Sequence, residues 1–350
     1  MRCKLVAVAV AVALGAASVT AHAATGDTTV GGKMYFDFTH IDQKNSDTGK
    51  TNNTGTGTDV KRFYLSVSHQ FDDIWSANLT TDFNYVSSDG ETNLFVKKAY
   101  VQGKFSKAAV LRIGSADMPW IPFVEGVYGY RYVEPTLTDR LHFANSADWG
   151  IHLGGKVGGN DMVSYEAAVV NGKGYKNPGR SKGVDFGGRI AIMPIDGLVI
   201  AAGGYSGNRG LETQNTSAMN TATRADLLVG YVGKRFRVGG EYFTAKNWNN
   251  VMTTATDKAD GFSVWASAGL TDNMSAFIRY DNAKMSKDLD PAKKDTYYNA
   301  GVEFDVTKGF KLAVAYKHET GKYTEAVLFP PVHVASTKTN EIGVWGQVAF

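Results

Sequence analysis

The chain ends in Lys338-Thr-Asn-Glu-Ile-Gly-Val-Trp-Gly-Gln-Val-Ala-Phe350, a stretch with a two-residue period. Ile342, Val344, Gly346, Val348 and Phe350 fall on one side, and the residues between them form a mixed, more polar side. This pattern predicts an amphipathic β-strand that finishes on an aromatic residue. Taken alone, such a strand fits the edge of many β-proteins, so the rest of the chain must decide the fold.

The other end of the chain has the pattern of an export signal. Arg2 and Lys4 precede an apolar run from Leu5 to about Ala17, and Ala21-His22-Ala23 is a small-x-small cleavage site. The run is too short to span a bilayer as a helix. We therefore expect residues 1–23 to be a cleaved secretory signal peptide and residues 24–350 to be the mature domain. Cys3, the chain's one cysteine, would leave with the signal.

Charge and composition exclude several classes of protein. The full chain has 37 Lys and Arg against 34 Asp and Glu. Loss of Arg2 and Lys4 leaves 35 basic against 34 acidic residues, a net charge of +1. A nearly neutral chain argues against a nucleic-acid partner. The many Gly, Tyr and Phe residues, the few Pro residues and the lack of helix-period stretches favour an all-β fold.

Alternating segments of about ten residues recur along the mature chain and predict about sixteen strands. Trp75 to Tyr85 shows the pattern, with Trp75, Ala77 and Leu79 on one face. His69 and Lys97 are the exceptions on the apolar face, each near a strand end. The predicted ranges are 29–42, 59–71, 74–87, 93–105, 108–115, 147–157, 162–171, 184–193, 197–206, 223–234, 236–247, 260–270, 273–285, 296–306, 309–321 and 338–350.

The connections between these segments alternate between short and long. Seven are tight turns, such as Asp72-Asp73 and Thr307-Lys308. Eight are longer, near 43–58, 88–92, 116–146, 172–183, 207–222, 248–259, 286–295 and 322–337. This alternation is typical of a transmembrane antiparallel up-and-down β-barrel with both termini at the periplasmic end. The same alternation would be unusual in a β-sandwich.

Four short motifs stand out along the mature chain: Val30-Gly-Gly-Lys-Met-Tyr-Phe-Asp-Phe38, Val60-Lys-Arg-Phe-Tyr-Leu65, Leu111-Arg-Ile-Gly114 and the terminal strand to Phe350. With these motifs the chain resembles Gram-negative outer-membrane porins of the general-diffusion and phosphate-selective porin O/P-like families. The resemblance implies a trimeric, water-filled channel in the cell outer membrane, surrounded by lipid and lipopolysaccharide, for small hydrophilic solutes and ions. It also implies that the third outer loop, residues 116–146, folds inward to narrow the pore. The alternative is that this loop covers the outer mouth or contacts a neighbouring subunit.

Charged residues near this loop are candidates for the pore constriction. Arg62, Lys98 and Arg112 face the predicted lumen on the second, fourth and fifth strands. The loop contributes Glu125, Arg131, Glu134, Asp139 and Arg140. Opposed positive and negative rims would create a transverse field, and Arg suits such a site because its guanidinium stays charged. The alternative is that these are ordinary lumen charges with local partners.

The sequence leaves other functions open but supports them less. An anion, phosphate or sugar preference is an alternative, although Trp120, Tyr128, Tyr130 and Tyr132 are more simply explained by packing than by a sugar track. A non-conducting receptor or adhesin is a further alternative. An enzyme is not expected, because no nucleophile motif is present. No cofactor or metal is expected either, because the histidines lack ligand spacing.

Overall fold

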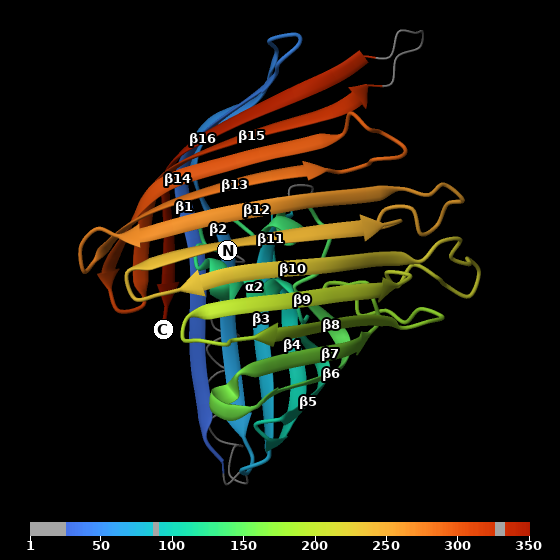
Figure 1. Ribbon diagram of the computed structural model, residues 1–350, viewed down its shortest axis with the longest axis vertical. Helices are drawn as coiled ribbons and strands as arrows, with labels where there is room; N and C mark the ends of the chain where they lie inside the picture. The colour runs from blue at the N-terminus through green and yellow to red at the C-terminus, as the bar shows by residue number, and fades with distance from the viewer. Residues whose placement is uncertain (1–25, 87–90, 326–332) are drawn as a thin grey trace, which may run out of the picture.

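The computed structural model describes residues 26–86, 91–325 and 333–350, and the predicted signal peptide, residues 1–23, lies outside these residues. Sixteen strands lie in the described residues (Figure 1). They are β1 Thr28–Asn45, β2 Thr51–Gln70, β3 Trp75–Val86, β4 Glu91–Ser106, β5 Ala109–Asp117, β6 Ala147–Val157, β7 Val163–Val170, β8 Asp185–Ile192, β9 Leu198–Gly207, β10 Ala222–Val232, β11 Phe236–Lys246, β12 Lys258–Gly269, β13 Met274–Lys284, β14 Lys294–Thr307, β15 Phe310–Glu325 and β16 His333–Ala349.

The strands form one closed barrel in which each strand is antiparallel to the next and β1 pairs with β16. The seam runs from Lys33 opposite Ala349 to Asn45 opposite Thr337. The backbone N–H of Gly32 also donates to the Phe350 carbonyl at 2.9 Å, so the last residue completes the closure. The prediction of an all-β barrel of about sixteen strands is confirmed. Barrels of this size leave room for an aqueous lumen.

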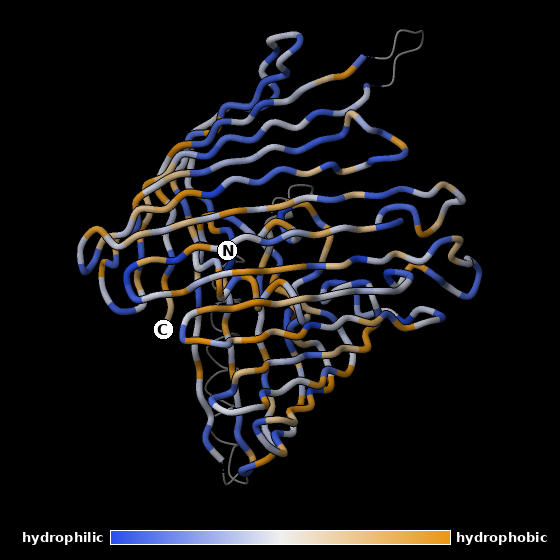
Figure 2. The backbone as a smooth tube through the Cα atoms, in the orientation of Figure 1, coloured by the Kyte–Doolittle hydropathy of each residue, from blue (hydrophilic) through white to orange (hydrophobic). Residues whose placement is uncertain are grey.

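The two faces of the wall differ as the alternation predicts. On β10, Leu227 and Val229 are more than half exposed on the outer face, whereas Asp226 and Leu228, which alternate with them, are buried on the inner face. Figure 2 shows the same alternation of apolar and polar residues along the strands. A charge on a lipid-facing position near the bilayer centre costs about 2–4 kcal/mol, which explains the apolar outer face.

The hairpin of β1 and β2 is longer than predicted. Residues 43–58 were expected to be a loop, but pairing continues to Lys44 opposite Thr51, and the turn occupies only residues 46–50. The first half of β2, Thr51–Thr58, consists of Thr, Asn and Gly, so it has no apolar face from which a strand could be predicted. Likewise β15 and β16 extend into the predicted loop 322–337, up to Glu325 and from His333.

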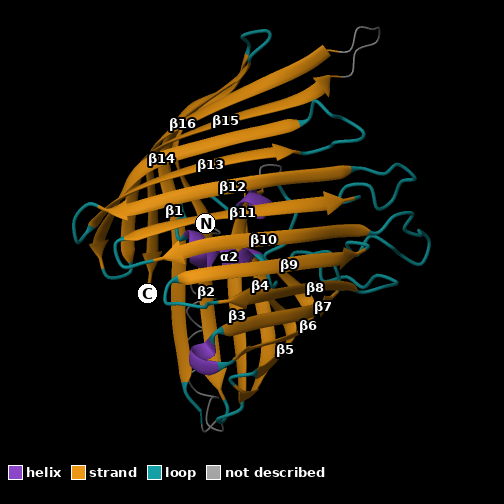
Figure 3. Cartoon of the chain, viewed as in Figure 1, coloured by secondary structure: helices purple, strands orange, loops and turns teal. Residues whose placement is uncertain are grey.

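The segment between β5 and β6, residues 118–146, forms two short helices, α2 Ile121–Tyr128 and α3 Leu137–Arg140. Pro122 suits the first turn of α2, and Gly129 ends it with φ 85°, a conformation that glycine adopts without strain. Trp120, Val124 and Tyr128 are buried in one cluster with inner-face residues of β10, β12 and β13, including Leu228, Trp265 and Phe277. The segment therefore packs against the inner face of the wall, as Figures 1 and 3 show for α2 behind β10 and β11.

Candidate pore constriction

The three predicted basic residues lie on the inner face of β2, β4 and β5, and each has a carboxylate partner. Lys98 Nζ lies 2.6 Å from Asp117, Arg112 Nη1 lies 3.5 Å from Glu166, and Arg62 Nη1 lies 3.7 Å from Asp82. Arg112 Nε also donates to Gln102 at 2.9 Å. The structure thus brings the three side chains to one region of the wall but largely pairs their charges locally.

Lys97 was expected on the lipid-facing side, and that expectation is wrong. The register of β3 and β4 shifts between Thr80 opposite Lys98 and Thr81 opposite Val96, so Lys97 is the extra residue of a β-bulge. Its ammonium donates to the Tyr64 hydroxyl at 3.2 Å and lies 4.5 Å from the centre of that ring. Two consecutive lysines, Lys97 and Lys98, therefore reach the inside of the barrel.

A hollow of about 400 Å³ lies between this basic wall and α2. Lys33, Lys97 and Lys98 contribute its positive charges, and Asp117 and Glu125 its negative charges. Tyr35, Tyr64 and Pro122 supply apolar lining surface. Among the described residues, Lys33 and Lys97 form no ion pair, so three lysines face two carboxylates, of which Asp117 is already bound to Lys98. The lining of the hollow is therefore net positive.

The predicted residues of the segment divide into two groups. The first lies near the hollow, where Arg131 bridges two carboxylates, with Nε 2.6 Å from Glu125 and Nη2 3.2 Å from Asp139. Burial raises the pKa of the Glu125 carboxyl, although the neighbouring Arg131 opposes that shift. The chain of Glu125, Arg131 and Asp139 forms the acidic side opposite Lys97.

The second group, Glu134 and Arg140, binds the far side of the barrel, although Glu134 was expected to stand opposite the basic residues. Glu134 is bound by Lys317 at 3.1 Å and by the Tyr297 hydroxyl at 3.0 Å, on the far strands β15 and β14. Arg140 Nε lies 3.2 Å from Asp281, and its other nitrogens bind Asp295 and Glu319. These two residues attach the segment to the wall through Lys317, Asp281, Asp295 and Glu319, partners whose positions the sequence could not predict.

Other contacts anchor the segment to the same side of the barrel. Arg189 Nε donates to the Pro119 carbonyl at 2.9 Å, and Arg237 Nη1 donates to the Val127 carbonyl at 3.0 Å. The Tyr132 hydroxyl donates to Glu303 at 2.7 Å. Trp120, Tyr128, Tyr130 and Tyr132 are buried in this packing, as expected from their proposed structural role.

Sequence reasoning missed a contribution from the loop between β7 and β8. Tyr175 of this loop stacks on Phe95 of β4 with ring centres 5.8 Å apart, and the Lys97 ammonium lies 5.6 Å from the Tyr175 ring. The Tyr175 backbone is held by β6, because its N–H donates to Ala147 and its carbonyl accepts from the Trp149 indole at 2.9 Å. No local sequence pattern predicts this long-range contact.

Across residues 26–86, 91–325 and 333–350, His, Cys, Asp and Glu side chains form no group of three that could hold a metal ion. In the same part of the chain, no helix has both the length and the apolar character needed to cross a membrane.

Comparisons with known proteins agree with this architecture. A family model described as phosphate-selective porin O and P matches residues 29–121. No curated protein sequence matches the chain. The structure is similar to an anion-selective porin from Comamonas acidovorans, with a TM-score of 0.64 at 14% identity, covering 93% of this chain and 100% of that chain.

Two further solved structures share the fold at low sequence identity. OmpF of Salmonella typhi, solved with daunomycin, matches with a TM-score of 0.59 at 14% identity, covering 92% of this chain and 97% of that one. OmpT of Vibrio cholerae, described as an outer membrane protein in trimer form, matches with a TM-score of 0.55 at 14% identity, covering 93% and 99%. At this identity, the likeness concerns the fold.

Proposed function

We propose that this chain is an outer-membrane porin and that its lumen is a passive diffusion channel that favours small hydrophilic anions. The observation that carries the proposal is the net positive lining of the hollow between the basic wall and α2. Ion selectivity in such pores depends on their width and on the charges that line them. The match of residues 29–121 to phosphate-selective porins is consistent with an anion preference.

In this proposal, residues 118–146 narrow the pore and Lys97 sets its selectivity. Lys98, Arg112 and Arg62 contribute less to the preference because Asp117, Glu166 and Asp82 offset their charges. Lys97 is held by a phenol and by ring faces rather than by an ion pair. A cation–π contact contributes about 0.5–2 kcal/mol, so these contacts hold the ammonium only weakly. A passing anion can therefore replace these contacts.

We further propose that the chain works as a homotrimer surrounded by lipid and lipopolysaccharide. The family match and the fold indicate a channel rather than an enzyme, and we propose that the chain has no catalytic role. The support for a trimer is the described trimer form of the Vibrio cholerae protein, which shares the fold.

The test is single-channel recording of the purified protein in planar bilayers under a potassium chloride gradient. We expect ohmic conductance steps grouped in threes. The reversal potential should lie closer to the chloride equilibrium potential than to that of potassium. Lys97→Met should shift the reversal potential toward potassium, whereas Lys97→Arg should keep the wild-type value because it keeps the charge. A silent membrane with folded protein would favour a receptor or adhesin, and a potassium-selective wild type would contradict the anion preference.

A further inference from the structure

Aromatic rings and lysine ammonium groups alternate along one path on the basic side of the barrel. The path begins in the loop between β7 and β8, where Lys176 Nζ lies 4.8 Å from the centre of the Phe95 ring. Phe95 stacks on Tyr175, and Lys97 Nζ lies 5.6 Å from the centre of the Tyr175 ring and 4.5 Å from that of Tyr64. All three distances are within the about 6 Å at which a ring face attracts a cation. The path ends at the hollow between the basic wall and α2, which Lys97 and Tyr64 both line.

The hollow has an apolar corner beside its cations. Tyr35 and Tyr64 meet edge to face, with ring centres 6.1 Å apart and ring planes at 90°. Lys33 is paired directly with Tyr64 across β1 and β2, and its side chain also lines the hollow. Two tyrosine rings and the ammonium groups of Lys33 and Lys97 therefore belong to one site.

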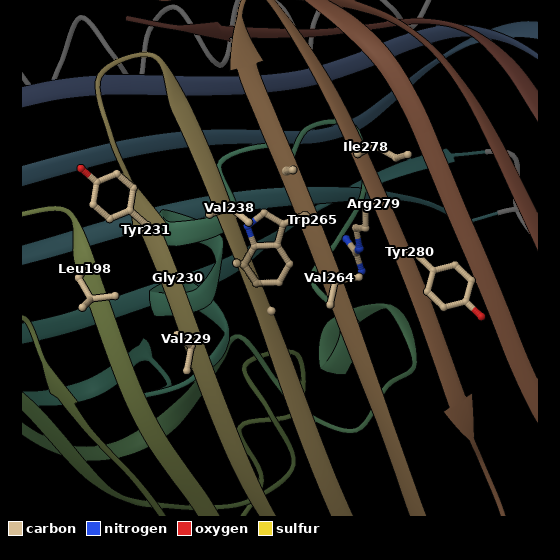
Figure 4. Close-up of a pocket in the computed structure, with 13 residues that line it drawn as sticks. Leu198, Val229, Gly230, Tyr231, Val238, Val264, Trp265, Ile278, Arg279 and Tyr280 are labelled. Carbon is tan, nitrogen blue, oxygen red and sulfur yellow. The ribbon is translucent and has the colours of Figure 1, made fainter.

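The helix α2 forms the other side of the hollow and is held by the far wall. Pro122 and Glu125 of α2 line the hollow. At the end of the helix, Tyr128 packs against Trp265 with ring centres 5.4 Å apart, and the Arg279 guanidinium lies 4.8 Å from the centre of the Tyr128 ring. Figure 4 shows Trp265 on β12 and Arg279 on β13, with the helical segment behind these strands. Because α2 is anchored in this way, the hollow is preformed, as small-molecule sites usually are.

The lining of the hollow suits an organic anion better than an inorganic one. Its volume of about 400 Å³ falls within the range of about 300–1,000 Å³ that small-molecule sites occupy, which is more room than one inorganic oxyanion fills. An inorganic anion would use the lysines and leave the tyrosine rings without a partner. A carboxylate attached to a planar ring would use both, because aromatic rings attract one another edge to face or offset-stacked beyond the effect of buried area.

We propose that this hollow binds aryl carboxylates on their way through the lumen. The carboxylate would bind the ammonium groups of Lys97 and Lys33, and the ring would lie against Tyr35 and Tyr64. The rings and the lysine at the outer loop would receive the same kind of solute before it reaches the hollow. The inference rests on the proposed anion channel and adds a class of solute to it.

Block of the chloride current by benzoate tests the proposal in single-channel recordings of the purified protein. Benzoate bound in the hollow excludes chloride, so the concentration that halves the current measures the affinity. This concentration should be about fivefold lower for benzoate than for cyclohexanecarboxylate, which has the same charge and ring size but no aromatic face. Inorganic phosphate should need a higher concentration than benzoate.

Three variants locate the ring contact. Tyr64→Leu should raise the half-blocking concentration of benzoate about fivefold and remove the preference over cyclohexanecarboxylate, because leucine is apolar but has no ring. Tyr64→Phe keeps the ring and should keep the preference. Tyr242→Leu makes the same change on the outer face of β11, where the tyrosine is 43% exposed, and should be blocked by benzoate like wild type.

Three results would overturn the proposal. Equal block of wild type by benzoate and cyclohexanecarboxylate would show that the rings take no part, and this comparison needs no variant if Tyr64→Leu fails to fold. Unchanged block of folded Tyr64→Leu would place benzoate elsewhere, and phosphate block at a lower concentration than benzoate would assign the hollow to inorganic anions. Any of these results in a chloride-selective wild type refutes this inference alone, whereas a wild type without anion selectivity refutes the channel proposal.

Discussion

Arg140 joins the segment between β5 and β6 to three carboxylates of the wall, and its removal should destabilise the protein measurably. Its side chain is only 8% exposed, and it contacts Asp281, at 0% exposure, and Asp295, at 9%. Breaking a buried ion pair by removing one partner typically costs about 3–5 kcal/mol, because the other charge stays buried. Asp281 keeps a second partner, Arg279 at 2.7 Å, so Arg140→Met should fall at the lower end, about 3 kcal/mol.

The assay is denaturant-induced unfolding of the barrel in lipid vesicles, followed by tryptophan fluorescence. The matched control is Arg235→Met, which breaks the pair with Asp272, where the two side chains are 73% and 98% exposed. That change should cost at most about 1 kcal/mol. Limited proteolysis should cut residues 118–146 faster in Arg140→Met than in wild type. If the two variants lose equal stability, and the segment resists protease in both, the anchoring argument is wrong.

Three further predictions concern the segment and the wall. Burial raises the pKa of Glu125, so this carboxyl should take up a proton before ordinary glutamates as pH falls. Below that pKa its negative charge is lost, and the reversal potential should move further toward chloride. Glu125→Gln should abolish that part of the pH dependence. Tyr132→Phe removes a buried hydrogen bond of 2.7 Å to Glu303 and should lower the free energy of unfolding by about 1.5–3 kcal/mol; an unchanged denaturation midpoint would contradict this. Gly114→Ala should lower the free energy of unfolding by about 3 kcal/mol or prevent assembly, because φ is 129° and the new Cβ would lie 2.1 Å from the Ala99 carbonyl oxygen. Gly126→Ala is the control, because open space surrounds its Cβ and the variant should fold normally. Heat-modified gel mobility measures folding of both variants.

Periodicity predicted the strands because lipid imposes the same rule on every one of them. An outward charge is costly wherever a strand crosses the bilayer, so alternation appears even in single segments such as Trp75 to Tyr85. Outside the bilayer an outward-facing polar residue costs little, so strands there need no apolar face. For this reason the sequence predicted loops for the polar half of β2 and the end of β15.

The candidate site was only partly predictable, for reasons that concern register and distance. A one-residue bulge moves the following side chains from one face of the sheet to the other. The sequence around Lys97 does not predict the bulge that lies opposite Thr80 and Thr81. The partners of Glu134 and Arg140 lie more than 140 residues away in sequence, so their pairing depends on how the segment docks. Arg62, Lys98 and Arg112 lie on the inner face that alternation predicts for them, and their role in the constriction stays a prediction.

The seam between β1 and β16 determines when the barrel can close. It pairs residues about 300 positions apart, and the last residue bonds to Gly32. Until β1 and β16 pair with each other, each presents a row of unpaired N–H and C=O groups that lipid cannot satisfy. The full chain must therefore be kept from aggregating before insertion. Pairing between residues so distant in sequence also makes folding slow.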